Sequence, residues 1–267
     1  MLQLQPLQPL TDLIMDRVKI LAIQRDELVL ILDDHYRLNK FAEHNIQAQA
    51  GLLMGVDPQL TQQFTQTIEH IIQALAYSKK VLKPKKYNAL QRWFGKDLEH
   101  KSLQLAYYQD LDQLLKQADH LSHKLQYEIQ QAQLRLAQVS LLRVEMAHYI
   151  VAAREFLKDY PQFQRSGYDH FIDRLSQKIN SLQTLQAHND IAIAQMQVTQ
   201  QLSFSLLDRY KEAQHVLIPA WQYHVKQSQH AVVGQGQKMA QLDQSREQLI
   251  QTLQKSLEKS HVKGQAK

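Results

Sequence analysis

The chain contains a stretch of 65 residues, from Lys96 to Tyr160, that has no glycine and no proline. These two residues interrupt helices most readily, so their absence permits one uninterrupted helix. Apolar residues recur through the stretch in alternating steps of four and three, as shown by Tyr107, Leu111, Leu114, Ala118, Leu121 and Leu125. This spacing keeps the apolar side chains on one face and predicts a single long amphipathic helix.

A second stretch without glycine or proline covers 51 residues, 168–218. Only a short turn containing Pro161 and Gly167 separates it from the first stretch, and helices joined by so short a turn pack antiparallel. The sequence therefore predicts a long, coiled-coil-like helical hairpin over 97–218. The second apolar stripe is interrupted by polar residues, whose partners are expected to fix the register. These residues are Asn189, Gln200 and Ser203.

The chain has only seven glycines and six prolines in 267 residues, which leaves few tight turns. This composition favours an elongated all-α fold over a sheet. We predict N-terminal helices over 1–76, a basic linker over 77–96, the hairpin over 97–218, and C-terminal helices with a mobile tail over 219–267.

Local signals suggest how the flanking helices begin and end. We expect one helix from a cap at Thr11 toward Ala50, and a second of about 25 residues opening at Asp57-Pro58. Pro219 is expected to end or kink the second long helix, because proline cannot donate the backbone hydrogen bond. A last amphipathic helix is predicted over 238–259.

The chain has no cysteine, which excludes disulfides, thiol nucleophiles and cysteine-ligated metals and fits a reducing compartment. The N-terminus lacks the basic and apolar regions of a signal peptide. The longest aliphatic run, 28–32, is far too short to span a bilayer. We expect a cytoplasmic protein, with peripheral attachment to the inner face of the membrane as an alternative.

Positive charge is concentrated in one segment. Residues 77–96 carry a charge of +7 and no acid, whereas the whole chain carries +5, so the other 247 residues sum to −2. The cationic residues are Lys79, Lys80, Lys83, Lys85, Lys86, Arg92 and Lys96, and they flank Trp93 and Phe94. The favoured interpretation is a solvated linker whose two aromatic rings pack on neighbouring helices. Docking on an anionic membrane or acidic protein, or on nucleic acid, stays open.

Two Glu-x-x-His pairs occur, at Glu145/His148 and Glu212/His215. Such pairs on facing helices can form di-iron sites in helical bundles. Here both lie beside the apolar stripe, and a hairpin turning near residue 164 would place them at different levels. The sequence also lacks a nucleophile elbow and a glycine-rich phosphate loop. We therefore expect no enzymatic activity, no cofactor and no metal site.

One part of the chain resembles a known family. Residues 195–200, Gln-Met-Gln-Val-Thr-Gln, followed by 217–221, Leu-Ile-Pro-Ala-Trp, resemble the C-terminal signature of the TelA-like toxic anion resistance proteins. Preceding features agree in order, including Arg-Trp-Phe-Gly-Lys at 92–96 and the long helix. The signature residues are Gln195, Gln200, Ile218, Pro219 and Trp221. Gln197 and Gln222 depart from it, because the family commonly has arginine and lysine there.

This resemblance implies a non-enzymatic protein that acts in resistance to tellurite and related stress through protein partners or self-association. The alternative function is a peripheral scaffold that docks on anionic lipid through the basic linker. Nucleic acid is not the expected partner. For Trp221 we favour a packing role over a partner-facing one. Lys79, Lys80, Lys83, Lys85, Lys86, Arg92 and Trp93 are the candidate anion- or partner-binding residues.

Overall fold

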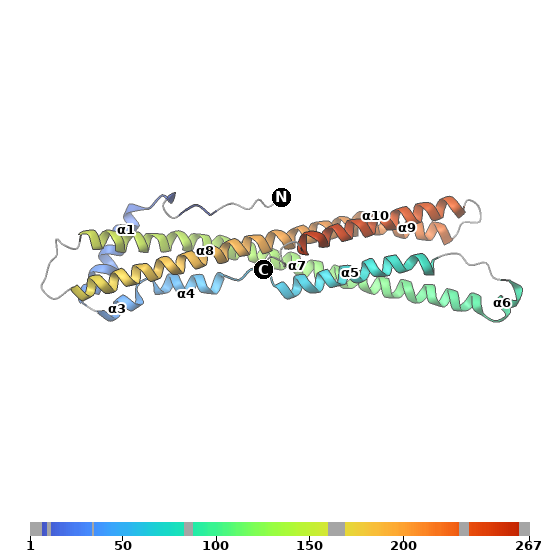
Figure 1. Cartoon of the computed structure of the whole chain (residues 1–267), viewed down its shortest axis with the longest axis horizontal. Helices are drawn as coiled ribbons and strands as arrows, with labels where there is room; N and C mark the ends of the chain where they lie inside the picture. Colours follow the sequence, from blue (N-terminus) through green and yellow to red (C-terminus); the bar gives the residue numbers. More distant parts are fainter. Residues whose placement is uncertain are drawn as a thin grey trace. The chain divides into compact units, whose positions relative to one another are not determined.

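The computed structural model describes residues 7–9, 12–33, 35–82, 88–159, 169–229 and 235–261. Every regular element in these ranges is helical, which confirms the predicted all-α fold (Figure 1). The chain divides into two compact units, which we call the first unit (1–55 and 130–201) and the second unit (56–129 and 202–267).

The two longest helices, α7 (Lys96–Asp159) and α8 (Asp169–Glu212), contribute residues to both units. The first unit also contains α1 (Arg17–Ile23), the π-helix η2 (Gln24–Leu28), α2 (Val29–Asp33), α3 (His35–Lys40) and α4 (Glu43–Leu52). The second unit also contains α5 (Pro58–Val81), α6 (Ala89–Trp93), the π-helix η4 (Ala213–Leu217), α9 (Ile218–Gln229) and α10 (Gln235–His261).

The predicted helical hairpin is confirmed. α7 follows the glycine- and proline-free stretch from its first residue, as the periodicity of its apolar residues indicates. In the first unit Arg143 of α7 pairs with Asp190 of α8. In the second unit Asp119 of α7 accepts a hydrogen bond from Gln214, beyond the end of α8. The chain segments thus run antiparallel. The predicted turn at Pro161 and Gly167 lies outside the described residues.

The core of the first unit forms where α7 and α8 face each other and the N-terminal helices cover them. Met146, Ile150 and Ala153 of α7 belong to one buried cluster with Phe171, Leu175, Ile179 and Leu182 of α8 and Ile20, Leu28, Ile31, Leu38 and Phe41 from the N-terminal helices. Full burial of an aliphatic or phenyl side chain stabilises a fold by about 1.5–3 kcal/mol. The apolar stripes read from the sequence therefore form the core.

The N-terminal region differs from the single helix predicted. α1 begins at Arg17, where the Asp16 carboxylate accepts the N–H groups of Val18 and Lys19. The predicted cap, Thr11, lies outside the described residues. The helical path breaks at Phe41 and Ala42, and Ala42 adopts a left-handed φ of 60°. Both side chains are buried there, so packing against the core outweighs the cost of the break.

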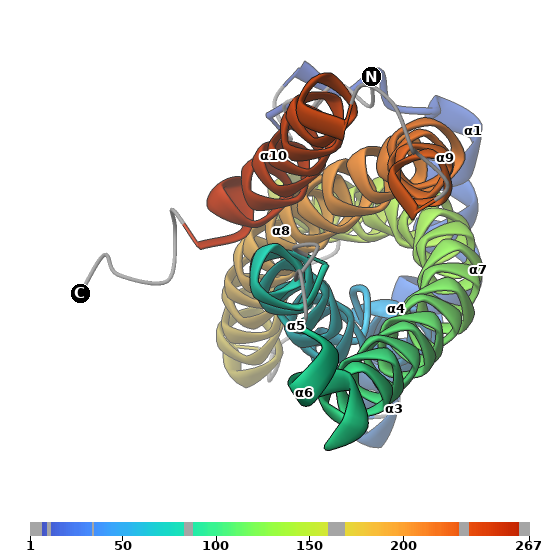
Figure 2. The ribbon, with the colours of Figure 1, turned by 90° about the vertical axis from the view of Figure 1, so that its right-hand side faces the viewer.

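In the second unit, α5 opens as predicted, with Asp57 accepting the N–H of Gln59 and Pro58 in the first turn. Its buried face includes Phe64, whose ring meets Tyr210 edge-on at 4.9 Å between centroids. α9 and α10 lie side by side, as the end-on view shows (Figure 2). The last helix is longer at both ends than the predicted 238–259.

Pro219 does not end the helical path. The preceding turn widens into η4, in which the N–H of Ile218 donates to the carbonyl of Ala213, five residues earlier. Proline lacks an N–H and its ring collides with the carbonyl four residues before it in a regular helix, and a widened turn relieves this conflict. The path therefore continues as α9.

No helix within the described ranges combines the length and the apolar character needed to cross a bilayer.

Candidate functional site

The basic segment lies in the second unit. Lys79 and Lys80 occupy the last turn of α5, and both are exposed. Lys83, Lys85 and Lys86 lie outside the described residues. Arg92 and Trp93 form the end of the short helix α6 and are also exposed. Lysines in the last turn of a helix are favoured by the negative end of its dipole.

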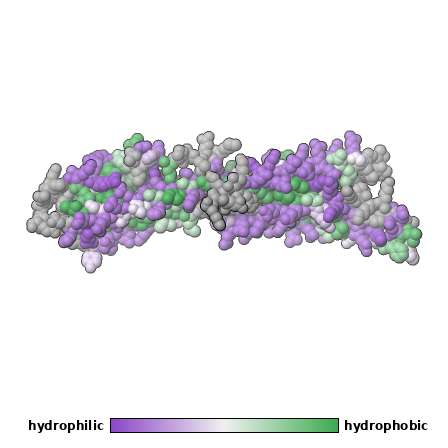
Figure 3. Space-filling model, viewed as in Figure 1, coloured by the Kyte–Doolittle hydropathy of each residue, from purple (hydrophilic) through white to green (hydrophobic). Residues whose placement is uncertain are grey.

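Trp93 and Phe94 do not pack on neighbouring helices. Trp93 is 82% exposed and Phe94 is 68% exposed, and their rings meet edge-on at 5.4 Å. Leu90 and Leu98 are each 70% exposed. We call these four residues the exposed tip, and Figure 3 shows hydrophobic residues gathered at the α6 end of the second unit. The solvated-linker interpretation is wrong in its claim that the two aromatic rings are covered.

A glycine makes the turn that carries the exposed tip. Gly95 has φ of 73°, a left-handed conformation that residues with a side chain rarely adopt, and it connects α6 to α7. Arg92 and Lys96 stand next to the tip in the sequence, but Asp97 and Glu99 follow in the first turn of α7 and balance their charge. The tip therefore combines large apolar side chains with charges of both signs, and the excess positive charge of the basic segment lies in the lysines from 79 to 86.

The two segments that resemble the signature of the toxic anion resistance proteins lie in different units. Gln195 and Gln200 are on α8 in the first unit, where Gln195 is exposed and Gln200 is buried. Thr199 lies against Gly55, where an added Cβ would approach its hydroxyl oxygen to 3.0 Å. The segment that contains Gly55 also contacts α7, because the Arg135 side chain donates hydrogen bonds to the carbonyl oxygens of Met54 and Gly55.

The second part of the signature belongs to the second unit. Ile218 is buried, Pro219 is exposed, and the Trp221 ring is only 2% exposed. The burial of Trp221 agrees with the predicted packing role. Its indole Nε1 is buried too, and it has no hydrogen-bond partner among the described residues. A cavity of about 360 Å³ lies beside the ring.

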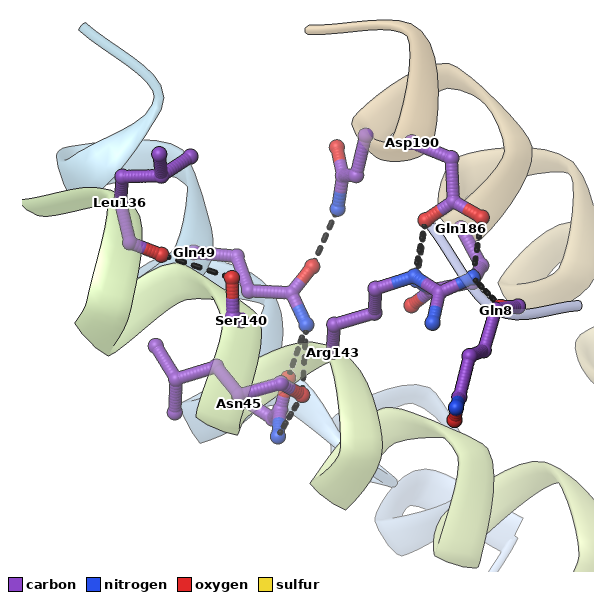
Figure 4. Close-up of polar contacts among 10 residues, drawn as sticks. Gln8, Asn45, Gln49, Leu136, Ser140, Arg143, Gln186 and Asp190 are labelled. Atoms are coloured by element: carbon purple, nitrogen blue, oxygen red, sulfur yellow. Dashed lines mark hydrogen bonds and ion pairs between the residues drawn. The ribbon is translucent and has the colours of Figure 1, made fainter. Parts of the chain in front are cut away.

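A buried polar cluster connects the helices of the first unit (Figure 4). Arg143 Nε donates to Asp190 Oδ1 at 2.7 Å and Nη2 donates to Asp190 Oδ2 at 2.8 Å. Gln186 donates to the same carboxylate at 2.9 Å. Arg143 Nη2 also donates to the carbonyl oxygen of Gln8, so the guanidinium of this α7 residue contacts both α8 and the N-terminal segment. Such bidentate pairs are directional and fix the relative position of the helices that carry them.

An amide chain extends the cluster to α4. Gln49 Nε2 donates to the carbonyl oxygen of Leu142 and to Asn45 Oδ1, each at 2.8 Å. Asn45 Nδ2 donates to the same carbonyl at 3.2 Å. Asn189 of α8 donates to Gln49 Oε1. The polar position predicted to fix the register therefore has a buried partner on α4.

Sequence reasoning missed Arg143, Asn45 and Gln49. A signal for Arg143 was present, because it stands four residues after Val139 and three before Met146, at the spacing of the apolar stripe. A charged residue at such a position must find a partner if the stripe is buried. Asn45 and Gln49 give no comparable signal, because α4 has no strong apolar face of its own.

The two Glu-x-x-His pairs belong to different units, Glu145/His148 to the first and Glu212/His215 to the second. In the first unit, His148 Nε2 accepts the N–H of Asp16 at 2.9 Å, and Nδ1 faces the carbonyl oxygen of Val144 at 2.7 Å. The described residues contain no group of three or more His, Cys, Asp or Glu side chains placed to hold a metal ion. Through its hydrogen bond with Asp16, His148 of α7 connects to the residue that precedes α1.

These features define an all-α protein built on a long helical hairpin, with polar contacts between its helices and an exposed apolar and aromatic tip. The chain is 29% identical over 194 residues to protein KlaA from Escherichia coli, a match that covers 66% of this chain and 72% of that protein. No family model matches the chain, and no solved structure matches it.

Proposed function

We propose that this chain is a non-enzymatic protein of the TelA-like toxic anion resistance type. It would act in the cytoplasm, in resistance to tellurite or related stress, through protein partners or self-association. The observation that carries this proposal is the ordered signature at 195–200 and 217–221. The similarity to KlaA, a protein of the TelA-like group, supports it.

The use of the polar side chains in the first unit supports a role without catalysis. Arg143, Asp190 and Asn189 contact groups on other helices, and His148 caps the start of α1. These side chains are used in contacts between helices. The proposed activity is therefore presentation of a helical surface to a partner.

Tellurite tolerance tests the proposal. A strain that lacks the gene should grow at several-fold lower tellurite concentrations than its parent, and the wild-type gene should restore growth. The double variant Asp190→Asn with Arg143→Gln reports whether the buried pair is needed, once circular dichroism has shown that it keeps the helical content of the parent. Equal tolerance of the deleted and parent strains, with unrelated toxic agents also without effect, would contradict the proposal. Purified protein should not reduce tellurite in the presence of a nicotinamide cofactor.

A second candidate function is docking on anionic lipid through the basic linker. The exposure of Trp93 and Phe94 favours it, because tryptophan and phenylalanine beside basic residues suit the headgroup region of a bilayer. Each cationic side chain near an anionic membrane contributes about 1 kcal/mol. Engagement of half of the seven charges of the linker gives a few kcal/mol, enough for weak and reversible recruitment.

Co-sedimentation with vesicles tests this second candidate. We expect binding to vesicles with 30% phosphatidylglycerol, little binding to phosphatidylcholine alone, and weaker binding as salt rises. Replacing Lys79, Lys80, Lys83, Lys85 and Lys86 with glutamine should abolish binding. The matched control replaces five exposed lysines elsewhere, Lys19, Lys40, Lys124, Lys158 and Lys226, and removes the same charge.

The aromatic contribution is measured separately. Trp93→Ala with Phe94→Ala leaves every charge in place and should reduce binding at physiological salt, whereas the lysine control should not. If the wild-type protein does not co-sediment with anionic vesicles even at low salt, membrane docking is ruled out. Equal loss of binding in the linker variant and in the lysine control would show that only net charge matters.

A further inference from the structure

The first turns of α7 extend past the end of α5 in the second unit (Figure 1). The Gln104 side chain of α7 donates to the carbonyl oxygen of Val81, the last residue of α5, at 3.0 Å. The residues of α7 that precede Gln104 therefore lie beyond this contact. Leu98 and Leu103 are both exposed among them, so this part of α7 has apolar side chains that face solvent.

One side of these turns continues the exposed tip. Leu105 is 61% exposed and follows Leu98 by seven residues, so the two side chains lie on the same side of α7, about 10 Å apart. Together with Leu90, Trp93 and Phe94 they form the hydrophobic surface at the α6 end of the second unit (Figure 3). We call these five residues the tip face.

The tip face is large enough to take part in a stable interface. Trp93 and Phe94 alone expose roughly 300 Å², and Leu90, Leu98 and Leu105 add to this area. The largest apolar patch of a typical monomer covers roughly 300–600 Å² and is often functional. The smallest stable interfaces between proteins need roughly 600 Å² from each partner. A second molecule that covers the whole tip face therefore approaches the area that a stable contact needs.

The charges around the tip face have both signs. Arg92, Lys96 and Glu99 are exposed, and Asp97 stands between Lys96 and Leu98 in the sequence. A two-fold contact uses the same surface on both copies, so that surface must be complementary to itself. A face with both cations and carboxylates meets this requirement, because the cations of one copy can pair with the carboxylates of the other. An anionic bilayer attracts Arg92 and Lys96 but repels Glu99, so the charge pattern favours a second copy as the occupant.

We propose that the tip face is a self-association surface, on which two copies of this chain pair about a two-fold axis. The apolar side chains of the tip face pack across the axis, and Glu99 of each copy pairs with Arg92 of the other. This inference rests on the proposed function, which includes self-association, and it names the surface that carries it. In membrane docking the rings of Trp93 and Phe94 enter a bilayer instead, so a measurement with vesicles separates the two occupants.

Sedimentation velocity of the full-length chain measures the association directly. Without lipid, the mass should rise with protein concentration from that of one chain toward that of two. Leu98→Glu places a carboxylate within the apolar surface and should raise the dimer dissociation constant at least about tenfold. Leu141→Glu is the matched control and should leave the constant unchanged. Leu141 belongs to the same helix but to the first unit, and it is 73% exposed, compared with 70% for Leu98.

Charge exchange tests the pairing between the two copies. Glu99→Arg adds positive charge to the tip face and Arg92→Glu adds negative charge, so each variant alone should associate several-fold more weakly than the parent. A mixture of the two variants brings opposite charges together across the axis and should restore the parental dissociation constant in a mixed dimer. Fluorescence anisotropy with one of the two variants labelled measures this mixed association.

Three results would overturn the proposal. They are a wild-type chain that stays monomeric up to about 0.5 mM, equal effects of Leu98→Glu and Leu141→Glu, and mixed charge variants that associate no better than each variant alone. A monomeric chain that binds anionic vesicles and loses this binding in Trp93→Ala with Phe94→Ala would assign the tip face to the bilayer.

Circular dichroism checks the helical content of each variant. If Leu98→Glu does not fold, the charge variants still decide the matter, because Arg92 and Glu99 are exposed and their replacement does not disturb the core. Tellurite tolerance is not a readout of these experiments. A monomeric chain therefore leaves the proposed resistance function, acting through other protein partners, untouched.

Discussion

Arg143 and Asp190 are joined by two nearly parallel hydrogen bonds, of 2.7 Å and 2.8 Å, between α7 and α8 in the first unit. The Arg143 side chain is 5% exposed, whereas the Asp190 side chain is 26% exposed. A guanidinium placed so deeply needs its partner, because a buried charge without compensation is strongly destabilising.

The first prediction is that Asp190→Asn destabilises the first unit by about 3 kcal/mol. The substitution keeps the shape of the side chain but leaves the Arg143 charge uncompensated. Removal of one member of a buried pair costs about 3–5 kcal/mol, and the partial exposure of Asp190 places the effect at the lower end. Urea unfolding followed by circular dichroism measures the change.

Asp112→Asn is the matched control. Asp112 pairs with Lys116 one turn away on the same helix, and both side chains are more than half exposed. Exposed pairs of this spacing contribute about 0.3–0.5 kcal/mol. An equal effect of the two substitutions would contradict the argument from burial.

The second prediction compares the two tryptophans of the chain. Trp221→Ala should cost about 3–5 kcal/mol, because the ring is 2% exposed and its removal leaves a large cavity. Trp93→Ala, the same change at a ring that is 82% exposed, should change stability by less than about 0.5 kcal/mol. Thermal and urea unfolding of both variants provide the measurement. An unchanged melting temperature for Trp221→Ala, together with lost tellurite tolerance, would favour the partner-facing role instead.

Local signals in the sequence predicted the long helices well. The spacing of apolar residues and the absence of glycine and proline placed the start of the first long helix at residue 97, next to the observed Lys96, and the Asp57-Pro58 cap opened α5. These features depend on residues close together in the chain. The break at Phe41 and Ala42 could not be read in this way, because it follows from the packing of Phe41 on Tyr149, whose ring centroid is 5.4 Å away.

The polar contacts depend on register, which the sequence fixes only approximately. The predicted turn near residue 164 implied that residue 145 of the first long helix lies opposite residue 183 of the second. The observed pairing of Arg143 with Asp190 shifts this alignment of the two helices by several residues. The partner of Asn189 could not be inferred at all, because Gln49 belongs to α4. Likewise, composition placed Trp93 beside basic residues, but only the positions of the surrounding helices decide whether the ring is covered.

The third prediction uses two glycines with opposite expectations. Gly95 has φ of 73°, so Gly95→Ala should destabilise the second unit by about 1–2 kcal/mol although space is open around it. Gly51 lies within α4, and no atom comes within 4 Å of an added Cβ. Gly51→Ala should therefore stabilise the first unit by about 0.5–1 kcal/mol. Urea unfolding of both variants tests the pair, and changes of the same sign would be inconsistent with the two backbone conformations.

The last prediction concerns alkaline pH. Burial raises the pKa of Tyr107, Tyr149 and Tyr210 above the ordinary tyrosine value of about 10. For Tyr149 the hydrogen bond to Glu27 raises the pKa further. The folded chain therefore keeps these protons over a pH range in which the unfolded chain has lost them. The free energy of unfolding is insensitive to these groups below about pH 10 and falls as the pH rises above it.

Each of these tyrosines lowers the free energy of unfolding by up to about 1.4 kcal/mol per pH unit in that range. Urea unfolding at pH 8, 9, 10 and 11 measures the slope. Tyr210→Phe should make the decline shallower, because the ring stays buried and the ionisable group is gone. Lysines that titrate in the same range are unchanged between parent and variant, so the difference isolates the tyrosine. Tyr127→Phe, which removes a hydroxyl from an exposed ring, is the matched control, and an identical decline in the parent and in Tyr210→Phe would exclude this coupling.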